Sequence, residues 1–201
     1  MLLIGVNRSP YTRRVAITLA AYGVPYEQSC VSGFGNRDEV RQHNPLGRIP
    51  ALVLDDGETL LDSGAIVDFL DERYGGEQPT IPRAGAERRG VLKVAAMMIG
   101  ACDKGLQAAY HRNHMPVEKR HQPWIDDCMA QVKNALAAVD AMIDPTAPYL
   151  LPGRLTQADV TAVVAERLAR ALGVDTDVET PRLRALTKRL AEAPAFQVSE
   201  P

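Results

Sequence analysis

The sequence predicts two domains in series, an α/β domain followed by an all-α domain. In residues 1–76 of the 201-residue chain, short apolar runs typical of strands alternate with segments of helical periodicity. Residues 77–82 contain two prolines and predict a linker. After Arg83 the apolar residues recur with helical spacing, and almost no strand pattern is found. We therefore expect an α/β domain at 1–76 and an all-α domain at 83–201.

In the first domain, boundary residues mark where each element starts and stops. Ser9 at an N-cap position and Pro10 after it begin the first helix, and Gly23 ends it. Asp55-Asp56-Gly57 is a hairpin signal between two short apolar runs. The predicted strands are Leu2–Val6, Tyr26–Val31, Ala51–Leu54 and Thr59–Leu61, and the predicted helices start at Ser9, span Arg37–His43 and start at Asp62-Ser63. This order favours a mixed sheet with helices on its faces.

The second domain contains four segments with helical periodicity. Thr156 and Asp159 form a capping box at the start of the third segment, and Leu155 and Val160 occupy the positions of a hydrophobic staple. The predicted helices are Glu87–His111, Lys119–Ile143, Thr156–Leu172 and Pro181–Ala193.

Composition narrows the class of protein. The formal charge is −2 and the chain has no block of Lys or Arg, which argues against nucleic acid or an anionic membrane as a partner. The N-terminus has no basic segment before its short apolar run, so a signal peptide is not expected. Cys30, Cys102 and Cys128 are too widely spaced for a disulfide framework or a metal site. We expect a cytoplasmic protein without a membrane segment or a bound metal.

The segment Asn44–Pro50 carries two prolines and a glycine directly before an apolar run. Pro50 therefore stands at the first position of a strand, where a missing N–H is tolerated. On spacing alone, an ordinary trans turn is favoured. A cis Ile49–Pro50 bond would instead present the Ile49 N–H and C=O sideways, where an extended peptide can pair with them. Both readings stay open at this point.

Four motifs resemble those of the cytosolic glutathione transferases and follow the order of that family over nearly the whole chain. The motifs are Ser9–Val15, Asn44–Pro50, Asp62–Ile66 and Leu155–Asp159. The likeness is greatest to small bacterial members with serine at the first helix, and the tail 196–201 shares it. The resemblance implies a thioredoxin-like N-terminal domain, a helical domain that contributes a second-substrate pocket, glutathione as co-substrate and a homodimer.

The resemblance also assigns the glutathione-binding residues. It implies that the Ile49–Pro50 bond is cis and that the Ile49 backbone pairs with the cysteinyl part of glutathione. Asp62 and Ser63 would hold the γ-glutamyl end: its carboxylate suits Ser63 at a helix N-cap with free N–H groups, and its ammonium suits Asp62. Ser63 can cap its helix and bind glutathione at the same time. Arg48 is either a partner of the glycyl carboxylate or a solvated turn residue, and both readings stay open.

Ser9 is the candidate that activates the glutathione thiol. A free thiol has a pKa of about 8.5, so only about 3% is thiolate at pH 7. A hydroxyl donor next to the sulfur and a helix N-terminus behind it both favour the thiolate. The alternatives are that Ser9 is only a helix cap, or that Tyr11 is the donor rather than a residue that lines the second-substrate pocket. Tyr110 and Arg112, at the end of the first long helix, are further candidates for that pocket.

The tetrapeptide Ser9–Thr12 is similar to the Cys-Pro-Tyr-Cys motif of glutaredoxins, with hydroxyls in place of both thiols. Disulfide exchange requires a thiolate, so the chain should use glutathione as a substrate and have little thiol-transferase activity. The expected function is a serine-type glutathione transferase that conjugates glutathione to an electrophilic small molecule, as in detoxification. The alternatives are a non-catalytic module with the same fold, or a glutathione-dependent peroxidase or dehalogenase.

Overall fold

The computed structural model describes residues 1–151 and 153–197 and divides the chain into two compact units. Unit 1 comprises Met1–Arg83 and the C-terminal segment from Ala191, and unit 2 comprises Ala84–Leu190. The predicted helical domain ran to residue 201, whereas unit 2 ends at Leu190. The part of the tail resemblance at 198–201 lies outside the described residues. Among the described helices, none has the length and apolarity needed to cross a membrane.

Unit 1 contains a four-stranded mixed sheet with the strand order β2-β1-β3-β4. Its strands are β1 (Leu2–Ile4), β2 (Glu27–Ser29), β3 (Ala51–Val53) and β4 (Thr59–Leu61). β1 pairs in parallel with β2, while β1 with β3 and β3 with β4 are antiparallel. The mixed α/β sheet predicted from the sequence is thus confirmed.

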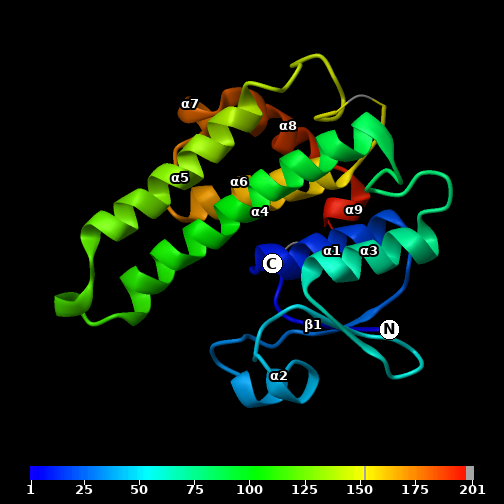
Figure 1. Cartoon of the computed structure of the whole chain (residues 1–201), viewed down its shortest axis with the longest axis horizontal. Helices are drawn as coiled ribbons and strands as arrows, with labels where there is room; N and C mark the ends of the chain where they lie inside the picture. The colour runs from blue at the N-terminus through cyan, green and yellow to red at the C-terminus, as the bar shows by residue number, and fades with distance from the viewer. Residues whose placement is uncertain (152, 198–201) are drawn as a thin grey trace. The chain divides into compact units, whose positions relative to one another are not determined.

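Helices cover both faces of this sheet (Figure 1). The helices α1 (Pro10–Ala21) and α3 (Ser63–Tyr74) pack on one face, and α2 (Arg37–His43) packs on the other. The core under α1 and α3 consists of Leu3, Val15, Ala16, Leu19, Val24, Leu52, Ile66 and Leu70. The core under α2 consists of Ile4, Val31, Val40 and Ala51. Successive strand residues such as Leu3 and Ile4 therefore lie in the cores on opposite faces of the sheet, because side chains alternate in direction along a strand.

Two predicted strands are shorter in the structure. β1 ends at Ile4 instead of Val6, because Gly5 has a φ of 139°, a conformation that side chains rarely adopt. β2 covers only Glu27–Ser29 of the predicted 26–31. Gly5 thereby turns the chain out of the sheet and toward the start of α1.

Unit 2 is helical throughout its described secondary structure. Its elements are α4 (Gly85–His114), η1 (Val117–Lys119), α5 (Gln122–Asp140), α6 (Gln157–Ala171), α7 (Thr176–Glu179) and α8 (Pro181–Ala191), which ends one residue past the unit boundary. α5 begins three residues later than predicted, because residues 117–119 form a separate turn of 3-10 helix. Gly105 lets α4 approach its neighbours closely: a Cβ there would lie 2.8 Å from Leu172 Cδ1 and 3.6 Å from Val132 Cγ2.

The short helix α9 (Pro194–Gln197) was not predicted. It packs on α1 in unit 1, and its Phe196 side chain is completely buried. A four-residue helix has too little periodicity to be recognised from sequence.

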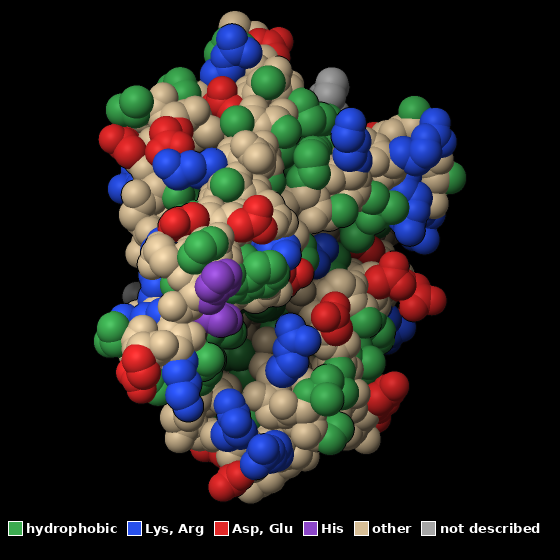
Figure 2. Space-filling view, turned by 60° about the vertical axis from the view of Figure 1, so that its left-hand side comes forward, with side chains coloured by type: hydrophobic (Ala, Val, Ile, Leu, Met, Phe, Trp, Pro, Cys, Tyr) green, Lys and Arg blue, Asp and Glu red, His purple; other side chains and the backbone are tan. Residues whose placement is uncertain are grey.

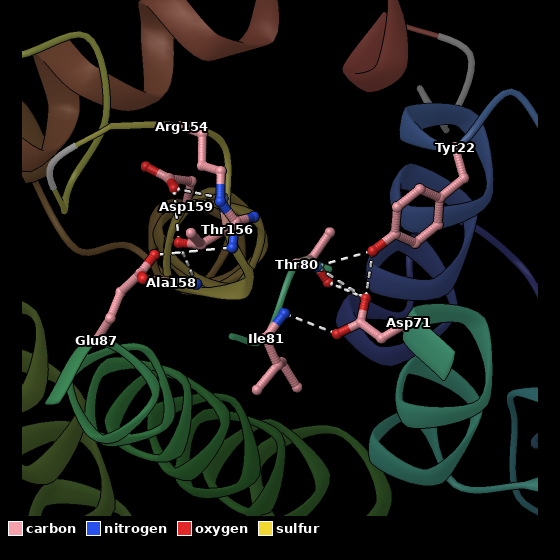
Figure 3. Close-up of polar contacts among 9 residues, drawn as sticks. All are labelled: Tyr22, Asp71, Thr80, Ile81, Glu87, Arg154, Thr156, Ala158 and Asp159. Carbon is pink, nitrogen blue, oxygen red and sulfur yellow. Dashed lines mark hydrogen bonds and ion pairs between the residues drawn. The ribbon is translucent and has the colours of Figure 1, made fainter. Parts of the chain in front are cut away.

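A buried carboxylate fastens the predicted linker to unit 1 (Figure 3). Asp71 Oδ1, on α3, accepts hydrogen bonds from the Tyr22 hydroxyl (2.5 Å), the Thr80 N–H (3.0 Å) and the Thr80 hydroxyl (2.6 Å). Its Oδ2 accepts the Ile81 N–H at 2.7 Å. The Tyr22 oxygen also accepts from the Thr80 N–H at 2.8 Å. The segment around Thr80 is therefore held by α1 and α3 rather than being a free connector.

This network predicts a loss of stability at alkaline pH. Burial and then the hydrogen bond to Asp71 raise the pKa of Tyr22 to about 12 from its ordinary 10. A raised folded-state pKa means that the contribution of Tyr22 is fully present below about pH 10 and is lost as the pH rises toward about 12. Between pH 9 and 11.5, urea unfolding should therefore show a steeper decline for the wild type than for Tyr22→Phe. Tyr74→Phe, on the exposed end of α3, should retain the wild-type slope. Parallel curves for wild type and Tyr22→Phe would contradict the coupling.

Candidate functional site

The first turn of α1 keeps a hydroxyl donor at its N-cap. Ser9 is half-buried, and its Oγ accepts the Thr12 N–H at 3.3 Å. This cap occupies an oxygen lone pair and leaves the hydroxyl hydrogen to be donated. Within the described residues, no hydrogen bond donated by the Ser9 hydroxyl is found. Ser9 therefore caps the helix and can also donate to an atom in front of it.

The loop before β3 is held by a buried amide side chain. Asn44 Nδ2 donates to the Arg48 C=O at 2.8 Å, and Asn44 Oδ1 accepts the Leu46 N–H at 3.0 Å. The Ile49–Pro50 bond is cis, as the family resemblance implies. In the described part of the chain, no hydrogen bond to the Ile49 backbone is found. The Ile49 N–H and C=O are thus available to a ligand.

Gly5 brings this loop and α1 together. A Cβ at Gly5 would lie 2.5 Å from Thr12 Oγ1 and 3.0 Å from Ile49 Cβ, so the first turn of α1 and Ile49 lie against the same point. The Gly5 C=O accepts Gln28 Nε2 at 2.7 Å, and the same Nε2 donates to Asn7 Oδ1 at 2.8 Å. The Gln28 side chain therefore holds the turn from β1 into α1 at both Gly5 and Asn7. No sequence pattern indicates this role of Gly5, because its neighbours in the structure are distant in the chain.

The start of α3 differs by one residue from the prediction. Asp62 is the N-cap, with a φ of 70°, and its Oδ1 accepts the Gly64 N–H at 2.7 Å. Ser63, predicted at the N-cap, is the first helical residue and is only 4% exposed. The correction follows from the short Asp side chain, which reaches the N–H two residues ahead. Asp62 is exposed, and the helix N-terminus favours negative charge beside it.

Arg14 links α1 to the start of α3. Its side chain is buried, and Nη1 donates to Ser63 Oγ at 3.5 Å. α1 thus places Thr12 beside Gly5, where Ile49 of the cis-proline loop also lies, and contacts the start of α3 through Arg14. Arg14 was not among the residues predicted for the site. The available signal was a pair of arginines directly before the buried run Val15–Leu19.

Arginine side chains surround the loop that precedes Pro50. Measured from the position of a Cβ at Gly47, Arg37 Cγ is 3.1 Å away and Arg41 Cγ is 3.6 Å away. Arg48 is exposed. Figure 2 shows Lys and Arg side chains on the lower part of the molecule, where α2 lies in Figure 1. Both predicted roles of Arg48, anion contact and solvated turn, remain open, and Arg37 and Arg41 join it as candidates.

The predicted second-substrate residues lie in different units. Tyr11 is half-buried in the first turn of α1. Tyr110 and Arg112 lie on α4 in unit 2, and the Tyr110 ring centroid is 6.0 Å from that of His114, with the rings tilted. Their assignment to one pocket stays a prediction. Across the described residues, no group of three or more His, Cys, Asp or Glu side chains is arranged to hold a metal ion.

Family comparison identifies both halves of the chain. Residues 3–78 match the N-terminal domain of glutathione S-transferase, and residues 122–189 match its C-terminal domain.

Full-length relatives agree with this match. The chain is 32% identical to a maleylacetoacetate isomerase of Pseudomonas aeruginosa, across all of this chain and 96% of the relative. A glutathione transferase family member from Pseudomonas fluorescens, solved with bound glutathione, superimposes with a TM-score of 0.86 at 30% identity, covering 100% of this chain and 98% of that one. A glutathione S-transferase from Methylobacterium radiotolerans, solved with glutathione sulfonate, has a TM-score of 0.92 at 25% identity, covering 100% and 94%. The chain belongs to the glutathione S-transferase family.

Proposed function

We propose that this protein is a serine-type glutathione transferase, in which unit 1 binds glutathione and Ser9 activates its thiol for attack on an electrophilic small molecule. The observation that carries the proposal is that α1 contacts the start of α3 through Arg14 and places Thr12 beside Gly5, next to which Ile49 also lies. An extended tripeptide can then pair with the Ile49 backbone while its two ends reach opposite parts of the site. The glutathione bound in solved relatives supports this reading.

Each part of glutathione has a matching group in the proposed site. The γ-glutamyl carboxylate faces the N-terminus of α3 at Ser63, and its ammonium faces the second oxygen of Asp62. The glycyl carboxylate faces the arginines near Gly47, with Arg48 as the first candidate. The cysteinyl sulfur faces the Ser9 hydroxyl, which donates a hydrogen bond to the thiolate. The electrophile then bonds to sulfur and its leaving group departs, or the sulfur adds to an activated double bond.

A second candidate is a glutathione-dependent isomerase. The observation that favours it is the full-length likeness to a maleylacetoacetate isomerase. In that chemistry the thiolate adds to a conjugated cis double bond, rotation occurs about the resulting single bond, and elimination returns the thiolate and the trans product. The same Ser9 and glutathione groups serve both reactions, so only the second substrate and the fate of glutathione differ.

Glutathione consumption separates the two candidates. With an activated aryl halide, a transferase consumes one glutathione per product. With a conjugated cis-enedione acid, an isomerase forms the trans product while the glutathione concentration stays constant. We expect turnover with at least one of these probes. If the protein binds glutathione but converts neither probe, and also converts no peroxide or haloalkane, it is the non-catalytic module.

The proposed γ-glutamyl site predicts a large loss of affinity in Asp62→Ala/Ser63→Ala. Wild-type glutathione affinity should lie between roughly micromolar and millimolar. Two hydrogen bonds to charged groups are lost together, so the double variant should bind about a hundredfold more weakly or worse. Isothermal titration calorimetry measures this directly. Asp68→Ala, which removes an exposed carboxylate from the same helix, should bind like the wild type. Unchanged affinity in the double variant would remove the proposed site.

Three expectations stay predictions: the two-fold homodimer, the cytoplasmic location, and the assignment of Tyr11, Tyr110 and Arg112 to the second-substrate pocket. The domain limits at 76 and 83 are likewise proposals.

A further inference from the structure

We infer that Arg14 is a positioning residue for ligand recognition, which holds Ser63 so that the site selects thiols bearing a free γ-glutamyl carboxylate. This inference rests on the proposed glutathione site and adds to it the group that determines selectivity at the γ-glutamyl end.

Arg14 places a permanent positive charge on α1. A guanidinium stays protonated at any pH at which the protein is folded. Arg14 is 6% exposed and lies on α1, so this positive charge is fixed inside unit 1 and little screened by solvent. The charge thus lies on the same helix that Ser9 caps.

Arg14 orients the hydroxyl of Ser63. Nη1 of Arg14 donates to Ser63 Oγ at 3.5 Å, between two buried side chains. Because the serine oxygen accepts from the guanidinium, its hydroxyl hydrogen is directed away from Arg14 and can be donated to another oxygen. The contact therefore orients Ser63 as a donor, and the nearby positive charge strengthens that donation.

Ser63 lies where the start of a helix favours an anion. It is the first residue of α3, a twelve-residue helix, where backbone N–H groups and the helix dipole favour an anion. Asp62 next to it already binds the Gly64 N–H through Oδ1 and carries negative charge. The arrangement suits a group with both signs of charge, a carboxylate toward Ser63 and an ammonium toward Asp62.

The test compares two ligands by calorimetry. Glutathione carries the γ-glutamyl carboxylate, whereas γ-aminobutyryl-cysteinylglycine keeps the ammonium, the thiol and the glycyl carboxylate but lacks that group. We expect Arg14→Met to weaken glutathione binding about tenfold or more, and the decarboxylated analogue by about twofold or less. Arg14→Lys, which retains the charge without the planar fork, should recover part of the difference. In turnover, the KM for glutathione should rise while kcat at saturation changes little.

Two controls separate selectivity from stability. Thr18→Val removes another buried polar group of α1, which donates to the Arg14 C=O at 2.9 Å, and should lower stability without changing the ratio of the two affinities. In a Ser63→Ala background, the effect of Arg14→Met on glutathione should shrink, because the residues act together. If Arg14→Met does not fold, Arg14→Lys and Ser63→Ala supply the same comparison.

Equal losses for both ligands, or full additivity with Ser63→Ala, would overturn the inference while leaving glutathione binding intact. A wild-type protein that binds neither ligand would instead overturn the proposed function.

Discussion

In Ser9→Ala the pKa of the bound glutathione thiol should rise by about two units, from an expected value of about 6.5 toward the free-thiol value of about 8.5. The variant removes the one hydroxyl donor proposed for the sulfur, while the Ile49 backbone, Asp62 and Ser63 still hold the peptide. A two-unit shift corresponds to about 2.7 kcal/mol, within reach of one hydrogen bond to a charged group plus the helix N-terminus. Thiolate absorbance, titrated with pH in the two complexes, measures it. Glutathione affinity should fall little.

The rate effect depends on pH. At pH 7 the thiolate fraction falls about 25-fold, but a more basic thiolate is a better nucleophile by about eightfold for two units. The net loss is therefore about threefold at pH 7 and about tenfold at pH 6, and it disappears or reverses above about pH 8. A variant slower by the same factor at every pH would contradict thiolate stabilisation by Ser9.

Three further variants distinguish Ser9 from its rivals. Ser9→Thr keeps both the hydroxyl and the cap and should retain the low thiol pKa. Tyr11→Phe should also retain it, unless the Tyr11 hydroxyl is the donor. Ser9→Cys restores the first thiol of the glutaredoxin-like motif. Its thiolate should attack oxidised glutathione, release one reduced glutathione and leave a mixed disulfide that is detectable by mass. Coincident titrations for wild type and Ser9→Ala would leave Ser9 as a helix cap only.

Asp159→Ala should cause a large loss of stability, on the order of 3–5 kcal/mol. Asp159 is completely buried and accepts the Leu150 N–H at 2.7 Å. It also accepts the Thr156 N–H at 2.9 Å and the Thr156 hydroxyl at 3.0 Å (Figure 3). The sequence predicted only the capping-box part of this set. Alanine leaves three buried donors unsatisfied, which is why the expected loss exceeds that of an ordinary cap. The melting temperature should fall by about 10 °C, with glutathione affinity nearly unchanged.

Asp144 provides a matched control for Asp159. It also accepts the N–H and the hydroxyl of one threonine, Thr146, at 2.9 and 2.7 Å, but in an exposed turn. Asp144→Ala should therefore cost much less. A collapse of glutathione affinity in Asp159→Ala without a change in melting temperature would place Asp159 in the ligand site instead.

The two carboxylates should also differ in pH dependence. Burial raises the pKa of Asp159 despite its hydrogen bonds, so its contribution to stability is greatest at low pH and declines as the pH rises through the folded-state value. The Thr146 hydrogen bonds lower the pKa of Asp144, so its contribution is present at neutral pH and is lost as the pH falls. The free energy of unfolding should be measured at several pH values between 3 and 7 for the wild type and both alanine variants. The loss caused by Asp159→Ala should become smaller as the pH rises, whereas the loss caused by Asp144→Ala should become larger.

The local pattern of the sequence determined the class of fold and most of the elements. Alternating apolar runs gave a mixed sheet, and Ser9, Pro10 and the Thr156–Asp159 pair identified two helix starts that the structure confirms. Arg37–His43 has the predicted bounds. These features depend on neighbours within four residues, so the residue types alone are sufficient to predict them.

Only the tertiary structure decided how the candidate site is assembled. Gly5, Thr12 and Ile49 meet at one point, and Arg14 reaches Ser63 across 49 positions in the chain, so neither contact leaves a periodic signal in the sequence. The same holds for α9, which is too short to predict and is held by the burial of Phe196. Asp62 is the cap instead of Ser63 because the chain enters α3 with a φ of 70° at Asp62, and from there the short Asp side chain reaches the Gly64 N–H. Either residue type can cap a helix, so the sequence alone does not choose between them. The path of the chain from β4 into α3 decides.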